Sequence, residues 1–296
     1  MITLNQNYTY EKLLELMDEL VDTYPEWMQM RELGISHDMR SIRLLIVGKG
    51  KPSIICTAGV HGRESINPIL LLHMAQYYGE CAKERKSINQ MNTAQLLEQY
   101  RILMIPIANP DGYVIATEGF GQIRNPVYRQ NAKIRQINHT YWKANARGVD
   151  INRNFPCSFY HRSMSSEYPG SENETQVLMR LFQEYDSEIY LDFHSRGRII
   201  YYYRNAMSEE YNAQAYNFAA YMQQLSKYKL GEPEDELSSV FGGGNTVQYY
   251  AESIGKPAIT IETLDDFVDF PNDCRYQSDT WQELMEIPLG VIAMLE

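Results

Sequence analysis

The chain has 296 residues, of which 44% are hydrophobic and 22% are charged, values that suit a globular protein with a substantial buried core. Its formal net charge of -11 argues against nonspecific binding to nucleic acid or to an anionic membrane surface. A local cluster of arginines could still bind an anion in a cleft, and no apolar stretch approaches the length of a transmembrane helix.

Hydrophobic periodicity predicts alternating helices and strands. In chain order, we expect a helix at 9–20, strands at 28–33, 41–48 and 54–58, a helix at 68–78, a polar surface connection at 80–91, a strand at 101–107, a helix at 172–185, strands at 187–193 and 199–204, a helix at 208–225, a strand at 258–263 and a helix at 281–295. Residues 114–168 show little periodicity and are rich in Asn, Arg, Gly and Pro. So much irregular chain in a compact domain usually lines a functional site.

This alternation contains no linker and no internal repeat. It predicts one α/β domain over residues 1–296, with a mixed, largely parallel central sheet flanked by helices on both faces. Ligands of such folds bind where strands end at their carboxyl edges. Four polar residues lie at or near such ends, namely His61, Asn109, His194 and Glu262.

The four cysteines are Cys56, Cys81, Cys157 and Cys274, and they include no C-x-x-C pair. We therefore expect free thiols in a reducing compartment rather than a disulfide scaffold. Residues 1–10 have neither the basic start nor the apolar run of a signal peptide. A cytoplasmic location is the resulting expectation, unless a leader has been removed.

The segment His61-Gly-Arg-Glu64 follows a predicted strand, and His194 ends another. Two histidines and one carboxylate leave one of the four tetrahedral positions of zinc open to water, as a catalytic site requires. Taken alone the H-x-x-E motif is weak, because an ordinary pair of polar loop residues gives the same pattern. The prediction is one zinc ion, although other divalent ions bind such donors.

Four further motifs stand at wide separations: N-P-D-G-Y at 109–113, G-V-D-I-N-R-N-F-P at 148–156, Y-P-G-S-E at 168–172 and I-T-I-E-T at 259–263. Together with the three candidate ligands, and in the same order, they resemble the zinc metallocarboxypeptidases related to pancreatic carboxypeptidases A and B. The resemblance runs from about residue 8 to the C-terminus, so it covers essentially a whole catalytic domain.

The resemblance implies that His61, Glu64 and His194 are the zinc ligands and that Glu262 is the general base and acid. Asp150 is a candidate to orient a ligand imidazole. The plain alternative for Glu262 is a surface carboxylate at a strand end.

The same resemblance implies that Asn152 and Arg153 hold the terminal α-carboxylate of the substrate, a role that suits the bidentate fork of arginine. A salt bridge on a loop is the alternative for Arg153. Arg63 is expected to polarise the scissile carbonyl or to hold a substrate anion.

The sequence departs from the pancreatic pattern in three places. Lys143 stands where those enzymes carry the arginine that stabilises the oxyanion, and lysine supplies the charge without the fork. Val240 and Phe241 lie where they carry a mobile tyrosine, so that hydroxyl is missing or comes from elsewhere. Val247 falls at the position that sorts C-terminal side chains, and it carries no charge.

The string at 142–156 is more similar to a bacterial branch of the family, whose members hydrolyse the γ-D-glutamyl–meso-diaminopimelate bond of cell-wall peptides. Diaminopimelate carries a second zwitterion at its distal end. Arg196 is a candidate for the distal carboxylate, with a solvated strand-end arginine as the alternative. Asp265 or Asp266 could meet the distal ammonium.

The leading hypothesis is therefore a zinc peptidase that releases diaminopimelate, or a similar residue, from muropeptides. A conventional carboxypeptidase acting on α-linked peptides is the second, and the deacylases of N-acyl amino acids are a further branch. A non-catalytic peptide-binding module is disfavoured, because such proteins usually lose a ligand or the base and all four residues are present here. The sequence gives no oligomeric state.

Overall fold

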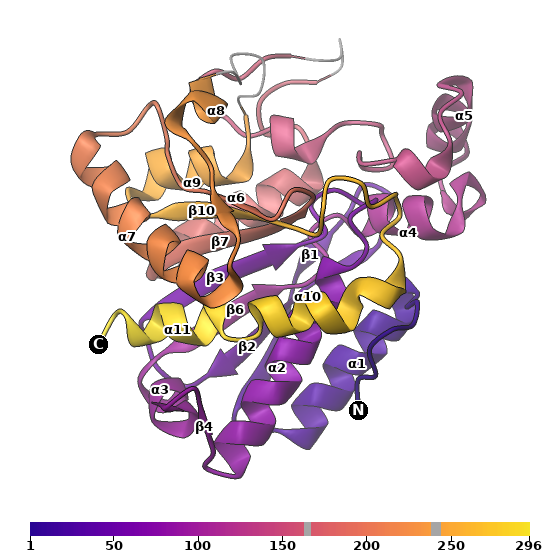
Figure 1. Cartoon of the computed structure of the whole chain (residues 1–296). Helices are drawn as coiled ribbons and strands as arrows, with labels where there is room; N and C mark the ends of the chain where they lie inside the picture. The colour runs from indigo at the N-terminus through magenta and orange to yellow at the C-terminus, as the bar shows by residue number, and fades with distance from the viewer. Residues whose placement is uncertain (163–166, 238–243) are drawn as a thin grey trace.

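The computed structural model describes residues 1–162, 167–237 and 244–296, and within these ranges eight strands form one mixed sheet (Figure 1). The strands are β1 (Met28–Ile35), β2 (Ser41–Gly48), β3 (Ser53–Ala58), β6 (Arg101–Ile105), β7 (Ser187–Ser195), β8 (Ile199–Tyr201), β9 (Lys229–Leu230) and β10 (Ala258–Thr263). A separate short ribbon pairs β4 (Ser87–Ile88) with β5 (Met91–Asn92).

The order of strands across the sheet is β1-β2-β6-β3-β7-β10-β8-β9. The central strands β6, β3, β7 and β10 run parallel to one another. Strand β2 is antiparallel to both of its neighbours, β1 and β6, and β8 is antiparallel to β10. Every residue of β3 is buried, as expected for a strand covered on both faces. The predicted mixed, largely parallel sheet is confirmed.

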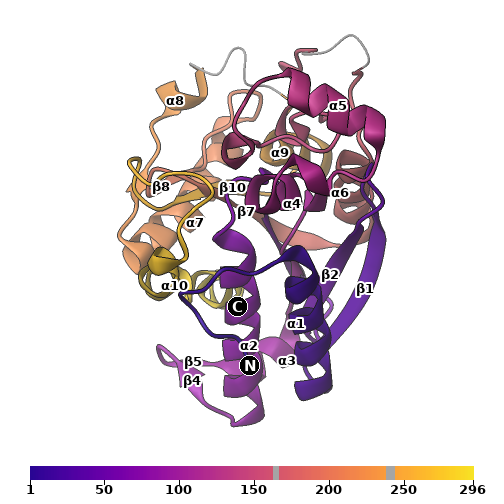
Figure 2. The same cartoon turned by 90° about the vertical axis from the view of Figure 1, so that its right-hand side faces the viewer.

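Helices cover both faces of this sheet (Figures 1 and 2). They are α1 (Tyr10–Thr23), α2 (Asn67–Lys83), α3 (Thr93–Gln99), α4 (Pro110–Glu118), α5 (Pro126–Ile134), α6 (Asn173–Glu184), α7 (Glu209–Ser226), α8 (Pro233–Leu237), α9 (Thr246–Ile254), α10 (Gln277–Leu284) and α11 (Ile287–Ala293), with short 3-10 turns η1 (Phe120–Gln122), η2 (His139–Tyr141), η3 (Ile151–Arg153) and η4 (Cys274–Tyr276). None of the helices described is long and apolar enough to cross a membrane.

Two hydrophobic cores lie on opposite faces of the sheet. Successive side chains of a strand point to opposite faces, and along β7 Leu191 and Phe193 belong to one core while Tyr190 belongs to the other. The first core packs under α1, α2, α10 and α11, and the second under α6 and α9. We call them the first and second core below.

The structure adds elements that periodicity did not predict. Within 114–168, which was expected to be irregular, lie most of α4 and all of α5, and α3 and α9 fall where no helix was expected. The single C-terminal helix expected at 281–295 is two helices, because Pro288 stands in the first turn of α11. The four cysteines are free, as predicted, and Val240 and Phe241 lie outside the described residues.

Candidate metal centre

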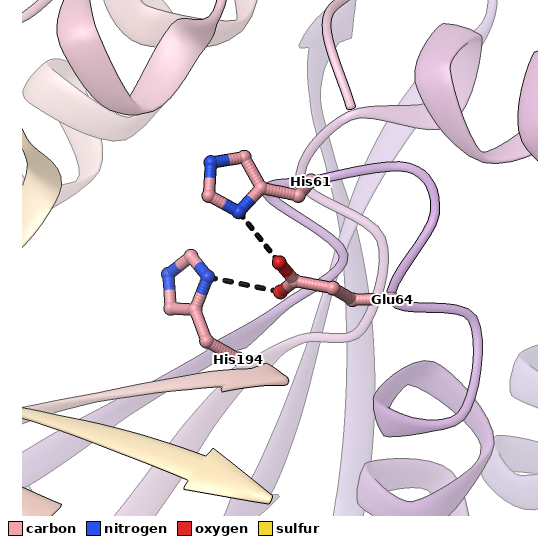
Figure 3. A group of neighbouring side chains, drawn as sticks. All are labelled: His61, Glu64 and His194. Carbon is pink, nitrogen blue, oxygen red and sulfur yellow. Dashed lines mark hydrogen bonds and ion pairs between the residues drawn. The ribbon is translucent and has the colours of Figure 1, made fainter. Parts of the chain in front are cut away.

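His61, Glu64 and His194 meet at the carboxyl edge of the sheet, where β3 and β7 end side by side (Figure 3). The Nδ1 atom of His61 lies 2.7 Å from Oε1 of Glu64, and Nδ1 of His194 lies 3.0 Å from Oε2 of the same carboxylate. One ligand atom from each side chain lies within 4.8 Å of the others. The structure therefore brings the three predicted ligands together.

The loop that carries the first two ligands is fixed against α4. Gly62 packs so closely on α4 that a Cβ atom there would lie 1.9 Å from the carbonyl carbon of Gly112. Asn109 caps the same helix and donates from Nδ2 to the backbone oxygens of Val60, at 3.1 Å, and Lys143, at 3.3 Å. The N-P-D-G motif thus holds the ligand loop rather than touching the metal position.

Each imidazole has a second carboxylate on its other side. Nε2 of His61 lies 3.3 Å from Oδ1 of Asp150, and Nε2 of His194 lies 3.0 Å from Oδ2 of Asp192. Asp192 is itself held by the Thr57 hydroxyl, which donates to its Oδ1 at 2.6 Å. Carboxylates at this ion-pair distance favour a proton on Nε2, which would leave Nδ1 of each imidazole to the metal.

Asp150 was anticipated from the sequence, but Asp192 was not. The signal for Asp192 is the spacing D-x-H within a strand, since residues two apart in a strand project to the same face. Asp192 and His194 share the face of β7 that also carries Tyr190.

The electrostatics of the three donors suit a dication. Burial would raise the pKa of Glu64, but the charges of His61 and His194 outweigh it and lower that pKa to about 2. Burial disfavours the charged form of His194, yet Asp192 and Glu64 raise its pKa well above the ordinary value. The carboxylates around the two imidazoles thus favour positive charge at this position. Two imidazole nitrogens and one carboxylate oxygen are a donor set that zinc takes, and a bound ion would compete with protons for the same nitrogens.

Glu262 lies beside this donor set. It is paired in register with His194 across β10 and β7, and its Oε2 atom is buried with no hydrogen-bond partner in the described part of the chain. Burial raises the pKa of Glu262 to about 7, against the lowering effect of His194. A carboxyl group whose pKa lies near neutrality can both accept and donate a proton.

Asn152 and Arg153 form η3 on the second-core side, between the buried side chains of Ile151 and Phe155. Oδ1 of Asn152 accepts from the backbone N–H of Thr246 at 3.0 Å. Nη1 of Arg153 donates to the backbone oxygen of Asn152 at 2.6 Å.

Lys143 contacts Asp150, the carboxylate beside the ligand His61: its Nζ lies 2.6 Å from Oδ2 of Asp150.

Val247 is 4% exposed and packs in the second core. Of the two acidic candidates, Asp265 pairs with Arg198 at 3.1 Å, whereas Asp266 is exposed and lies near Gly197.

Arg63 and Arg196 come together on one aromatic ring. Their guanidinium carbons lie 4.3 Å and 5.0 Å from the ring centroid of Phe270.

Replacing Asp192 with asparagine is expected to weaken zinc binding by about 10- to 100-fold, the usual effect of losing a carboxylate that orients a ligand histidine. The amide keeps the shape and the threonine contact but not the charge that faces Nε2 of His194. Zinc affinity is measured by competition with a chromophoric chelator. Asp186→Asn, at the exposed residue directly before β7, is the matched control. An unchanged zinc affinity of Asp192→Asn would show that Asp192 is not part of the site.

Comparison with known sequences agrees with this geometry. A profile of the Peptidase_M14 family, described as zinc carboxypeptidase, matches residues 13–286. The γ-D-glutamyl-L-diamino acid endopeptidase 1 of Lysinibacillus sphaericus is 24% identical over 272 residues, which cover 87% of this chain and 65% of that protein. Carboxypeptidase A4 of Mus musculus is 26% identical over 273 residues, which cover 86% and 62%. The chain thus spans less than two thirds of the length of either curated relative.

Solved structures show the same fold. Thrombin activatable fibrinolysis inhibitor superposes with a TM-score of 0.79 at 17% identity, covering 98% of this chain and 74% of that one. The murein-tripeptide amidase MpaA of Escherichia coli O157 gives a TM-score of 0.51 at 17% identity, covering 89% and 91%. The profile spans nearly the whole chain, and the two histidines and the glutamate converge as the single zinc site of such enzymes requires; this protein belongs to the Peptidase M14 family of zinc carboxypeptidases.

Proposed function

We propose that this carboxypeptidase hydrolyses the amide bond between a γ-D-glutamyl residue and a diamino acid, meso-diaminopimelate above all, in murein peptides. The observation that carries the proposal is the placement of cationic side chains on both sides of the metal centre. Asn152 and Arg153 lie between Ile151 and Phe155 of the second core. Arg63 and Arg196 stack on Phe270, where Arg196 donates to Val268 of the first core. A murein tripeptide carries carboxylates on both sides of the bond to be cleaved, unlike most α-linked peptides.

The relatives add support. One sequence relative is named for cleavage next to a γ-D-glutamyl residue, and one solved structure is named a murein-tripeptide amidase. The match to carboxypeptidase A4 and the uncharged Val247 favour the second candidate, a conventional carboxypeptidase that removes neutral residues from α-linked peptides.

Zinc bound at the three donors would supply Lewis acidity toward the scissile carbonyl and lower the pKa of water. In the proposed reaction Glu262 takes the proton of the water whose oxygen attacks the carbonyl carbon. It then gives the proton to the amine nitrogen as the carbon–nitrogen bond breaks. Lys143, whose Nζ lies 2.6 Å from Oδ2 of Asp150, supplies the positive charge that stabilises the carbonyl oxygen as it becomes negative. Arg153 and Asn152 hold the α-carboxylate of the released residue.

The test is a side-by-side assay of the zinc-loaded chain with L-Ala-γ-D-Glu-meso-diaminopimelate and a blocked α-linked dipeptide ending in Phe, with products resolved by mass spectrometry. We expect release of diaminopimelate and little or no release of Phe. Release of Phe alone would support the conventional carboxypeptidase. Release of neither product from protein with confirmed zinc would contradict both candidates and return the binding module to consideration.

A further inference from the structure

Two arginines beside the metal centre share one aromatic platform. Arg63 stands two residues after the ligand His61, and Arg196 two residues after His194. Both guanidinium groups lie over Phe270, in the loop that follows β10. The two segments that carry the zinc ligands therefore each place a positively charged side chain over Phe270.

Neither arginine has an acidic partner within the described parts of the chain. Arg63 makes no hydrogen bond or ion pair among those residues, and its buried Nε is unpartnered. Toward the residues that the structure describes, Arg196 donates from Nη1 alone, to the backbone oxygen of Val268. The neighbouring Arg198, in contrast, is neutralised by Asp265 at 3.1 Å and Glu283 at 2.7 Å.

This arrangement is unfavourable without an anion. Stacking on Phe270 offsets part of the repulsion between the two guanidinium groups, but no carboxylate among the described residues neutralises them, and the buried Nε of Arg63 has no acceptor there. The net charge of the protein is -11, so acidic residues that could pair with two arginines are plentiful. Because no described acidic residue pairs with Arg63 or Arg196, the two guanidinium groups are suited to bind an anionic ligand.

The pair lies across the metal centre from Asn152 and Arg153. Val268, which accepts from Arg196, belongs to the first core, as does Ile66 in the segment that follows Arg63. Ile151 and Phe155, which flank Asn152 and Arg153, belong to the second core on the opposite face of the sheet. The zinc donors stand at the sheet edge between the two groups, so a substrate held by Arg153 extends past them toward Phe270.

Resting on the proposed function, we propose that Arg63 and Arg196 bind the free α-carboxylate of the γ-linked glutamyl residue. In a γ-linkage the side-chain carboxyl group forms the scissile amide, which leaves the α-carboxylate free on the acyl side of that bond. An α-linked peptide has no carboxylate at this position. The two arginines are thereby the residues that select γ-glutamyl substrates, and Arg196 serves the acyl side instead of the distal end of diaminopimelate.

Two substrates that differ in one group test this assignment: L-Ala-γ-D-Glu-meso-diaminopimelate and the same peptide with its glutamyl α-carboxylate converted to a carboxamide. The zinc-loaded wild type should cleave the acid with a kcat/KM about 10- to 100-fold above that for the amide, the range of charge-assisted hydrogen bonds. Arg196→Gln and Arg63→Gln should each lose activity on the acid and little on the amide, so that the preference shrinks. Arg198→Gln, whose guanidinium is already neutralised, should keep the wild-type preference.

A binding measurement separates this inference from the proposed function. Zinc-loaded Glu262→Gln protein is titrated calorimetrically with both uncleaved peptides, alone and combined with Arg196→Gln, after thermal melts confirm that each variant is folded. Tighter binding of the acid that disappears with Arg196→Gln supports carboxylate binding by the two arginines even if turnover is slow. Equal binding and equal cleavage of acid and amide by the wild type would overturn it while leaving the proposed function intact, whereas cleavage of neither peptide would count against the proposed function alone.

Discussion

Replacing Glu262 with glutamine is expected to lower kcat by about 10²- to 10⁴-fold, the range associated with loss of a general acid–base group. Zinc should stay bound, because Glu262 is none of the three donors and its Oε2 makes no hydrogen bond to any described residue whose loss would disturb them. Turnover of the preferred peptide and zinc content by mass spectrometry are measured on the same preparation. Glu188→Gln, which breaks only a partly exposed ion pair with Lys256 in the loop before β10, is the control and should behave as wild type.

The pH profile distinguishes proton transfer from a merely structural role. In the metal-free protein burial raises the pKa of Glu262 to about 7, with Glu64 adding to the rise and His194 and His61 opposing it. A bound dication favours the ionised carboxylate and therefore shifts this pKa downward. Because the base must be unprotonated, kcat/KM of the wild type should rise with pH through a limb below about pH 7, and Glu262→Gln should lack that limb. Retained turnover with the limb intact would remove Glu262 from the mechanism.

Much of this site was predictable because its residues sit at the ends of strongly patterned strands. The strands β3, β7 and β10 appear in the sequence as short segments rich in apolar, mostly β-branched or aromatic residues. The histidine or glutamate at or just beyond the end of each segment is therefore easy to identify. The α1 helix was equally readable, since its apolar residues recur at helical spacing and the Thr9 side chain accepts from the Lys12 N–H at 3.2 Å.

Helices without a polar face were missed for a physical reason. Residues 110–116 of α4 are all buried, so the helix has no amphipathic period to detect. A different signal was available: α4 and α5 each begin with Asn followed by Pro, and in both the Asn side chain accepts a backbone N–H while Pro occupies the first turn. Caps combined with Pro at the first position mark a helix start more reliably here than periodicity does.

Contacts between distant segments were beyond reach of the sequence. The role of Phe270 as a stacking partner is visible only in the structure, where two loops that follow different strands place Arg63 and Arg196 over its ring. The strand order that puts Glu262 beside His194 is likewise a property of the assembled sheet. The sequence names the residues, but their pairing depends on tertiary packing.

Close packing of Gly62, in the H-G-R-E segment, against α4 fixes the position of the first two zinc ligands. Gly62→Ala is expected to destabilise the protein by about 1 to 3 kcal/mol, the usual cost of overpacking, and to lower kcat/KM by about 100-fold, because a displacement of about 1 Å at a reacting centre has that effect. The added Cβ would lie 1.9 Å from the carbonyl carbon of Gly112 and 2.5 Å from the backbone nitrogen of Tyr113. These are backbone atoms in the first turn of α4.

The helix cannot easily yield to this clash, since it is capped by Asn109 and since the buried Tyr113 hydroxyl donates to the backbone oxygen of Tyr8 at 2.7 Å. The ligand loop must therefore move, and His61 and Glu64 move with it. Melting curves with and without zinc test this directly, because a ligand that binds only the folded state raises Tm according to its affinity. Gly121→Ala meets nothing within 4 Å and should keep the full zinc-dependent rise, whereas Gly62→Ala should lose most of it. If Gly62→Ala retained both that rise and its activity, the contact between the H-G-R-E loop and α4 would not be what fixes the first two zinc ligands.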